Sequence, residues 1–311
     1  MLGLGLASSH APALFCPAEA WPVVYDAIPD YMKDSQPHTA KLETPEVIQS
    51  QLARTNKAFD VLRGEIARFK PDAIVFIGDD QGDMFNTSNM PQLAVFTGDE
   101  VWGSTTPGYM NEPPELSRIH IPVASDLAKH ILKGLIKHGF DPSNLEKMQP
   151  LGKPDVGMSH MVVYPHPKLI PDNDIPIVPI FINEYFPPMP TARRCWELGQ
   201  ALRQILDTWP GRIAIYASGG LSHDPGGPRA GWVDEPLDRW VLERIERNQA
   251  EELCGLFAFD SDTLRGGTGE IRAWITAAAA CGRAGRVVEY VVSHHAKVGL
   301  GFAVWPWNGA G

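Results

Sequence analysis

The chain has 311 residues, of which 44% are hydrophobic and 21% are charged. These proportions are ordinary for a globular protein and leave enough apolar surface for a sizeable core. The formal net charge of −10 at pH 7 argues against nucleic acid or an anionic membrane as a partner, because both are bound through basic patches.

The first residues predict a buried strand and no targeting segment. Residues 1–7 are apolar, but they lack a basic region and are followed almost at once by a histidine and a proline. A signal peptide has a different pattern, and no other apolar run is long enough to cross a bilayer. We therefore expect a cytoplasmic protein. The cysteines have no metal-type spacing and should be reduced and mostly buried; they are Cys16, Cys195, Cys254 and Cys281.

The first half of the chain predicts a strand, a long helix and a second strand. The strand at 3–7 ends just before His10, and an irregular proline-rich stretch follows. Thr44 is a typical N-cap with proline after it, and apolar residues then keep helical spacing as far as Phe69. Residues 73–77 form a continuous apolar run, which is typical of a central strand.

The second half predicts alternating helices and strands. Residues 86–118 are rich in Pro, Gly, Thr and Asn and should form loops and an edge strand. A helix at 123–138 should turn four apolar residues inward, namely Leu127, Ile131, Leu135 and Ile136. The later elements are a strand at 176–182, a turn at 186–190, a helix from the Thr191 cap to about Trp209, a strand at 212–217, a helix at 236–257, a helix capped by Thr268, and closing strands at 290–293 and 302–305.

No repeat and no low-complexity linker divides these elements. Strands alternate with helices, which favours a sheet covered by helices on its faces. We therefore expect a single α/β domain over residues 1–311, with a mixed central β-sheet flanked by helices.

Two residues with metal-binding side chains stand at predicted element ends. His10 follows the first strand, and open α/β sheets gather their functional groups at such edges. Glu270 stands in the first turn of a predicted helix, where a carboxylate complements the helix dipole but can instead hold a metal. Non-haem Fe(II) enzymes use two histidines and one carboxylate on one face of the ion.

Two further histidines suit proton transfer. His223 ends a Gly-Gly-Leu-Ser-His turn, where paired glycines let the backbone come close to a ligand or another strand. His160 follows Ser159 and stands five residues before Pro165. Near-neutral imidazoles can take up and release protons in a reaction. Four other histidines are expected to be structural or on the surface: His120, His130, His138 and His166.

The order of these motifs resembles that of the class III (LigB-type) extradiol ring-cleavage dioxygenases. That family has Ser-His-x-Pro, a strand ending in Asp-His, a histidine five residues before a proline, a Gly-Gly-Met/Leu-Ser-His turn, and a helix-initiating Glu with a Trp four residues on. The counterparts in this chain, in the same order, are His10, His160 with Pro165, the turn at 219–223, and Glu270 with Trp274.

Two stretches resemble the branch of the protocatechuate 4,5-dioxygenase β subunit and gallate dioxygenase. They are residues 227–231, just after His223, and the Pro-x-x-x-Arg-Cys stretch at 190–195. The likeness to the superfamily runs from residue 1 to about 305, and it is weak across 20–70 and 86–145.

The resemblance implies a role for each matching residue. His10 and Glu270 look like the first and third iron ligands. His223 looks like the residue that hydrogen-bonds the bound substrate or oxygen and carries protons. His160 looks like the second proton-handling histidine near the ring.

The chain departs from the family pattern at the second metal ligand. The family histidine stands four residues before a Phe, a position that Gln81 occupies ahead of Phe85. A glutamine amide oxygen can ligate iron, although more weakly than imidazole. The other residues that could replace the histidine are Asp79, Asp80, Asp83 and His38. A tight metal site could also be lost, and a site of one histidine with carboxylates would accept Mn or another divalent ion as well as Fe(II).

Three residues are candidates for binding the substrate. Lys297 stands in the C-terminal stretch where the carboxylate-binding branch reaches the acid group of its substrate, and a lysine there would pair with a carboxylate. A solvated loop lysine explains the same position equally well. Arg229 and Tyr185 are further pocket candidates.

The resemblance therefore implies an Fe(II)-dependent extradiol-type dioxygenase that opens a catecholic or related hydroxylated ring, carrying a carboxylate, with O2. One alternative is a diverged member that performs metal-assisted hydrolysis or decarboxylation, and another is a Memo-like binding protein without catalysis. The expected partners are the small aromatic substrate and O2. The expected assembly is a homodimer, with a small accessory subunit as an alternative.

Overall fold

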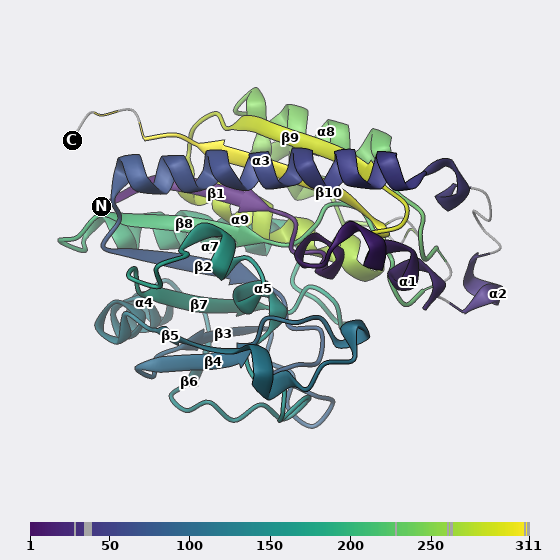
Figure 1. Cartoon of the computed structure of the whole chain (residues 1–311). Coiled ribbons are helices and arrows are strands. Elements are labelled where there is room, and N and C mark those ends of the chain that lie inside the picture. The colour runs from purple at the N-terminus through teal and green to yellow at the C-terminus, as the bar shows by residue number, and fades with distance from the viewer. Residues whose placement is uncertain are drawn as a thin grey trace.

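The computed structural model describes residues 1–27, 29–33, 39–227, 229–259, 261, 264–307 and 309. They form an eight-stranded mixed sheet in the order β6-β3-β7-β2-β8-β1-β10-β9 and a two-stranded sheet β4-β5 (Figure 1). The strands are β1 Leu2–Ser8, β2 Ala73–Gly78, β3 Leu93–Phe96, β4 Glu100–Ser104, β5 Arg118–Pro122, β6 Ser143–Leu145, β7 Ile177–Ile182, β8 Ile213–Ser218, β9 Arg286–Ser293 and β10 Val298–Trp305.

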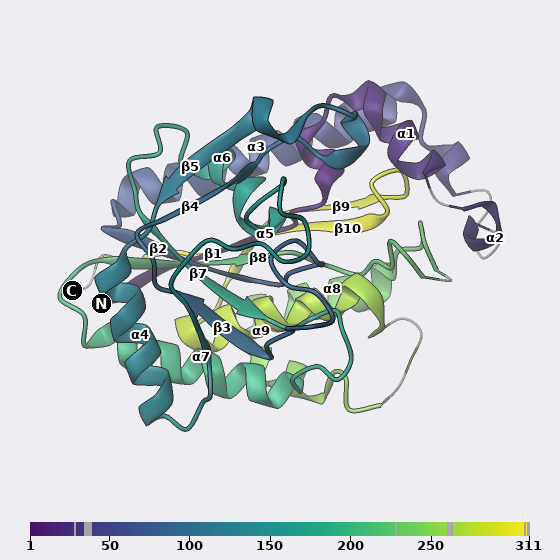
Figure 2. The same cartoon turned by 90° about the horizontal axis from the view of Figure 1, so that it is seen from below.

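Helices cover both faces of the large sheet (Figure 2). One apolar core lies between the sheet and α4, α7, α8 and α9, and the other lies between the sheet and α1, α3, α5 and α6. The helices are α1 Trp21–Asp26, α2 Asp30–Lys33, α3 Pro45–Phe69, α4 Ser125–Lys137, α5 His160–Val163, α6 His166–Leu169, α7 Ala192–Asp207, α8 Glu235–Glu246 and α9 Ile271–Cys281. Because both faces are covered, β2 and its neighbours β7 and β8 are buried at every position and mostly apolar.

Four neighbouring strands end at the same edge of the sheet. β7, β2, β8 and β1 are mutually parallel, so the residues that follow each of them meet at one edge. β10 is antiparallel to β1 and extends past its end. There, Gly299 exchanges backbone hydrogen bonds with Leu221 and Ser222. The turn that precedes β10 therefore also lies at this edge.

Most of the expected elements are present at nearly the expected bounds. Thr44 caps α3 by accepting a hydrogen bond from the backbone N–H of Val47, and Thr191 caps α7 in the same way through Arg194. All four cysteines are free, and three of them are buried. None of the helices among the described residues combines the length and the apolarity that crossing a membrane would need.

Three expectations about helices were wrong. The helix predicted at 236–257 ends at Glu246, and a 3-10 helix over Ala250–Gly255 follows it. On α4 the side chain of Ile136 is 59% exposed, because it lies off the stripe that its three apolar partners bury. Thr268 lies in a 3-10 helix over Gly266–Glu270 and caps no helix, so α9 begins one residue after Glu270.

The region 86–118 was also only partly predicted. It contains β4, which pairs with β5 away from the large sheet. It also contains β3, which is paired on both sides, with β6 and with β7, and is not an edge strand. The strand at the outer edge of the large sheet next to β3 is the short β6, which the sequence analysis missed because two of its three residues are exposed and polar.

We predict opposite effects for two glycine-to-alanine substitutions in helices. A Cβ on Gly199 of α7 would overlap the carbonyl oxygen of Thr276 and the Cβ of Ala279 on α9, so Gly199→Ala should destabilise the fold by about 1–3 kcal/mol. Gly64 in α3 has open space around it, so Gly64→Ala should stabilise by about 0.5–1 kcal/mol. Urea unfolding of both variants measures these changes, and equal effects would contradict the close α7–α9 packing.

Candidate active site

Three buried side chains from distant parts of the chain meet at this sheet edge. His10 follows β1, Asp79 follows β2, and Glu270 precedes α9. His10 Nε2 lies 3.5 Å from Glu270 Oε2 and 3.8 Å from Asp79 Oδ1. His160 is close as well: one ligand-type atom each of His10, Asp79 and His160 lies within 4.8 Å of the other two. A histidine with two carboxylates is a donor set that divalent metal ions accept.

Ser218 sets the tautomer of His10. The Ser218 hydroxyl, at the end of β8, donates to the carbonyl of Met161 at 2.6 Å. It can therefore only accept from His10 Nδ1, which lies 3.0 Å away and must carry the proton. The lone pair of His10 is then on Nε2, the atom that faces Asp79 and Glu270. A partner of this kind on the other ring nitrogen is what metal-binding histidines have.

Asp79 has surroundings that suit a metal ligand. Neither of its carboxylate oxygens, nor His10 Nε2, has a hydrogen-bond partner within the described part of the chain, and all three atoms are buried. Burial, and next the charge of Glu270, raise the pKa of Asp79 well above its ordinary value. A buried carboxylate without partners is costly, and a divalent ion between these groups would remove that cost. The residues present therefore fit a metal ion.

Gln81 lies in the site, but its amide nitrogen faces Glu270. It donates to Glu270 Oε1 at 2.7 Å, so it braces that carboxylate from the side. Asp80, one of the substitutes considered from the sequence, points into its own loop. Its two oxygens accept from the backbone N–H groups of Met84 and Phe85 at 2.8 and 2.9 Å. The carboxylate beside His10 is that of Asp79. His38 lies outside the described residues.

Glu270 is held by three donors. Gln81 and the backbone N–H of Gly220 donate to its two oxygens, and His223 Nε2 lies 3.2 Å from Oε1. Burial works to raise the pKa of Glu270, but the charge of His223 and the interaction with His10 outweigh it and hold the pKa well below the ordinary value. Glu270 is therefore a charged carboxylate at neutral pH.

His223 is bonded at both ring nitrogens to acceptors. Nδ1 lies 2.9 Å from the carbonyl oxygen of Leu221, and Nε2 faces Glu270. Both nitrogens must carry a proton to satisfy these acceptors, which describes an imidazolium. Burial lowers the pKa of His223, but Glu270 raises it further, so the net shift is upward. Thr268 holds the His223 backbone, and Gly267 lies so close to the ring that a Cβ there would overlap it.

His160 forms a second charged pair. Its Nδ1 lies 2.9 Å from Asp83 Oδ2, and the other oxygen of Asp83 binds Lys153 at 2.7 Å. Burial lowers the pKa of His160, but the hydrogen bond and charge of Asp83 outweigh it and raise the pKa to about 9. The ring meets that of His10 edge-on at 4.5 Å. His160 is thus positively charged at neutral pH and adjoins the candidate metal site.

These groups line a cavity of about 160 Å³. A cavity of about 150 Å³ is enough to hold a benzene ring. His10, Gln81, His160, His223 and Glu270 give it a polar side. Apolar and aromatic groups line the rest, including Val24 and Tyr109, and Lys297 lines it from the turn before β10.

The two other residues predicted to bind substrate lie elsewhere. Among the described residues, the lining of this cavity includes neither Arg229 nor Tyr185. The Arg229 guanidinium stacks over the ring of Trp232, 4.7 Å from its centre. Tyr185 follows β7, and its pKa is raised first by burial and then by the charge of Glu270. Their role in substrate binding stays a prediction.

Sequence reasoning missed two residues that shape the site and gave a third another role. Ser218 orients His10, and Glu184 is a fully buried acid after β7. Asp83, considered from the sequence as a substitute metal ligand, instead binds His160. Burial, followed by the charges of Asp79 and Glu270, raises the pKa of Glu184 well above its ordinary value. The available signal was position: Ser218 and Glu184 stand at or just beyond the ends of strands that run parallel to β2.

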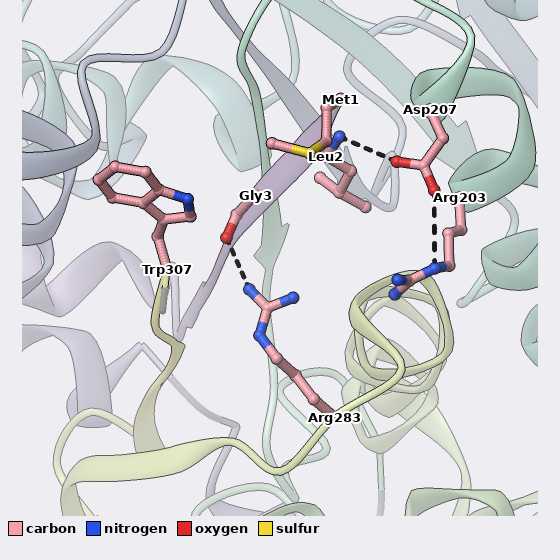
Figure 3. A pocket seen from close by; sticks show the side chains of 7 residues that line it. All are labelled: Met1, Leu2, Gly3, Arg203, Asp207, Arg283 and Trp307. Atoms are coloured by element: carbon pink, nitrogen blue, oxygen red, sulfur yellow. Dashed lines mark hydrogen bonds and ion pairs between the residues drawn. The ribbon is translucent and has the colours of Figure 1, made fainter. Parts of the chain in front are cut away.

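A larger cavity of about 370 Å³ lies at the opposite edge of the sheet, beside the start of β1 (Figure 3). Its two arginines bind the protein backbone. Arg283 donates to the carbonyls of Gly3 and Trp305, and Arg203 donates to the carbonyls of Ala280 and Cys281. Their guanidinium groups tie the ends of β1, β10 and α9 together, so we interpret this cavity as structural.

Comparison with known proteins gives one family match. Residues 37–303 match the family described as the catalytic LigB subunit of aromatic ring-opening dioxygenase. A 2,3-dihydroxyphenylpropionate/2,3-dihydroxicinnamic acid 1,2-dioxygenase of Mycolicibacterium gilvum is 30% identical over 61% of this chain and 56% of its own length. Gallate dioxygenase of Pseudomonas putida is 32% identical over 48% of this chain and 43% of its own length.

A longer alignment joins the chain to a dioxygenase of Klebsiella pneumoniae with the same name as the Mycolicibacterium protein. The two are 27% identical over 72% of this chain and 69% of the relative. The chain thus spans about half the length of the first two relatives and about two thirds of the third.

Asp238 on α8 fixes the turn that carries His223. Its Oδ1 accepts from the backbone N–H of Ser222 at 2.8 Å, and its Oδ2 accepts from the hydroxyls of Ser222 and Tyr290 at 2.9 and 2.7 Å. Gly299 passes so close that a Cβ there would overlap the carboxylate. Burial raises the pKa of Asp238 from 3.8 to about 7, although the hydrogen bonds act in the other direction.

This raised pKa makes the free energy of unfolding depend on pH. The folded chain holds the Asp238 proton up to about pH 7, and the unfolded chain releases it near 3.8. The stabilising contribution is therefore complete below the lower value and is lost as the pH rises to the higher one, by roughly 4 kcal/mol. When urea unfolding is measured across this pH range, the free energy of unfolding of Asp238→Asn should fall much less as the pH rises. Glu235→Gln, on the exposed side of the same helix, should keep the fall, and an unchanged slope in Asp238→Asn would contradict the shift.

Proposed function

Because this chain belongs to the LigB family of catalytic subunits of aromatic ring-opening dioxygenases, we propose that it opens the ring of a catecholic compound with O2, using a bound divalent metal ion. One observation carries the proposal: buried metal-ligating atoms of His10 and Asp79 that have no hydrogen-bond partner among the described residues meet the charged Glu270 beside a cavity the size of one ring. Two positively charged histidines adjoin the same cavity.

His10, Asp79 and Glu270 would hold the metal ion, which we propose to be Fe(II). Asp79 would then take the part that the second histidine plays elsewhere in the family, and Gln81 would orient Glu270. When bound, the ion supplies a Lewis acid for the two ring hydroxyls and a path for electrons from the ring to O2. Two carboxylates also suit the harder Mn(II), so the metal content of the purified protein is part of the test.

His223 and His160 would handle the protons. A catechol that binds as the monoanion has already left one hydroxyl proton in solution, and a ring-opened product must gain a proton on oxygen. His223 carries its exchangeable proton on Nε2, which Glu270 holds at the cavity wall. His160 is kept protonated by Asp83 on the side of His10. Both can donate a proton to an oxygen in the cavity and take it back afterwards.

The cavity wall supports a single ring with an acidic substituent. Val24, Tyr109 and Ala296 offer apolar surface for a ring, and Lys297 also lines the cavity. A carboxylate on the ring would form a charge-assisted hydrogen bond with the Lys297 ammonium. We therefore propose carboxylated catechols as the substrate class.

Metal retention distinguishes the proposed ligands from the bracing residue. Asp79→Asn and Glu270→Ala should each weaken metal binding more than the roughly tenfold to hundredfold expected from removal of an orienting partner. Gln81→Leu should fall within that smaller range. Metal content after dialysis and competition with a chelator give these affinities. Asp72→Asn, at the other end of β2, is the matched control and should keep its metal affinity. If Gln81→Leu loses more metal affinity than Asp79→Asn does, Gln81 is the ligand and Asp79 is not.

Removing the proton carrier should reduce turnover and leave the metal in place. His223→Ala should lower kcat about a hundredfold to ten-thousandfold, while the metal content equals that of the unaltered protein. Stopped-flow absorbance of the ring-opened product, together with metal analysis of the same sample, separates the two effects. Loss of metal in His223→Ala would instead make His223 a ligand.

The activity itself is tested by oxygen uptake. The protein is loaded with Fe(II) without air and then mixed with a panel of catechols in an oxygen electrode, with product identified by mass. We expect one O2 consumed per ring opened, with both oxygen atoms in the product. Hydrolysis or decarboxylation of the same compounds without oxygen uptake would contradict ring opening and indicate metal-assisted hydrolysis or decarboxylation instead. Binding without any conversion would indicate a protein that only binds.

A further inference from the structure

A buried acid outside the cavity holds the turn that carries Lys297. The turn at 294–297 joins β9 to β10, and Ala296, Lys297 and Val298 line the cavity. Glu43 lies just before α3, in a part of the chain where the resemblance to the family is weak. Only 9% of its surface is exposed.

Four donors converge on the Glu43 carboxylate. Oε1 accepts from the backbone N–H of His294 at 2.7 Å and from the side chain of Gln51 at 3.2 Å. Oε2 accepts from the backbone N–H of His295 at 2.8 Å and from its ring Nδ1 at 2.6 Å. Burial acts to raise the pKa of Glu43, but the hydrogen bonds from His295 and His294 outweigh it and lower the pKa. The Glu43 carboxylate is therefore charged, and each of its oxygens accepts two hydrogen bonds.

These bonds fix the path of the backbone into Lys297. The turn is four residues long and is bounded on both sides by paired strands, so a shift at 294–295 must move residue 297. Lys297 has a φ of 64°, in the left-handed region that a non-glycine residue adopts only when its surroundings impose it. Without Glu43, two backbone N–H groups of the turn would lose their acceptor, and the turn would relax to recover one.

Two other contacts hold the same turn, and neither of them involves the backbone N–H groups of both His294 and His295. The ring of His295 lies against that of Tyr25 at 5.6 Å, and His294 Nδ1 lies 3.0 Å from the carbonyl of Gly231. Gln51 also donates to the carbonyl of Val292 in β9, so it links the Glu43 carboxylate to the strand. Glu43 is the one acidic group in this set of contacts.

We propose that Glu43 is a positioning residue that holds Lys297 against the cavity and thereby gives the site its preference for rings with an anionic substituent. It touches neither substrate nor metal and acts only through the 294–297 turn. The inference rests on the proposed function insofar as it takes the cavity to be the place of the ring.

The test compares two ring compounds of the same shape and different charge. They are 3,4-dihydroxybenzoate and its neutral amide, 3,4-dihydroxybenzamide. The unaltered protein should bind the acid more tightly, and Glu43→Gln should weaken its binding about tenfold, the loss of one charge-assisted contact, with the amide changed less than about twofold. Under air the loss should appear in KM for the acid and leave kcat unaltered, because the reacting oxygens are untouched.

Three variants separate positioning from general stability. Glu46→Gln changes an exposed acid three residues along and should alter nothing. His295→Asn keeps a side-chain donor for Glu43 and should keep the preference, and His295→Leu should lose it. If circular dichroism shows that Glu43→Gln does not fold, the comparison of His295→Asn with His295→Leu tests the proposal by itself. Lys297→Met should lose the preference, and adding Glu43→Gln to it should cause no further loss.

The outcomes also separate this inference from the proposed function. Affinities are measured without air by titration, so they do not require ring opening. Glu43→Gln could lose the preference for the acid while the unaltered protein takes up no oxygen. That result would support the positioning role and contradict the proposed dioxygenase activity. Equal weakening of acid and amide, or no preference for the acid in the unaltered protein, would overturn the positioning role even if catechols are opened.

Discussion

The site depends on one electrostatic constraint: two carboxylates are buried side by side with His10 at the end of parallel strands. Glu270 is compensated from within the chain, by Gly220, Gln81 and His223. Asp79 is not, because neither of its oxygens has a partner among the described residues. Burial makes such a group costly unless a cation neutralises it. The tautomer of His10, the charge of the two flanking histidines and the shape of the cavity are all arranged around this centre.

Three residues that meet at this edge could be singled out from the sequence because each is tied to a local signal. His10 follows an apolar strand, His223 ends a double-glycine turn, and Glu270 stands next to a helix start, so sheet topology alone brings them to one edge. The choice between Gln81 and Asp79 could not be made in this way. Both lie in one short loop, and which side chain faces His10 depends on Glu270, a residue 189 positions away from Gln81.

The remaining errors have a similar cause. Thr268 has the side chain and the position of a helix cap, but His223 takes its hydroxyl, and this contact spans 45 positions in the chain. The Glu43 carboxylate is 252 positions from the His295 ring that it binds. Propensity and periodicity describe neighbours in sequence, so they place the elements of the fold well. They carry no information on which buried polar groups satisfy one another across the sheet.

The position of β1 has a consequence for how the protein is made. β1 lies between β8 and β10, so both of its neighbours in the sheet come much later in the chain. The Glu270 carboxylate that faces His10 likewise lies 260 positions after it. Until residue 270 has been synthesised, the three side chains of the candidate metal site cannot meet.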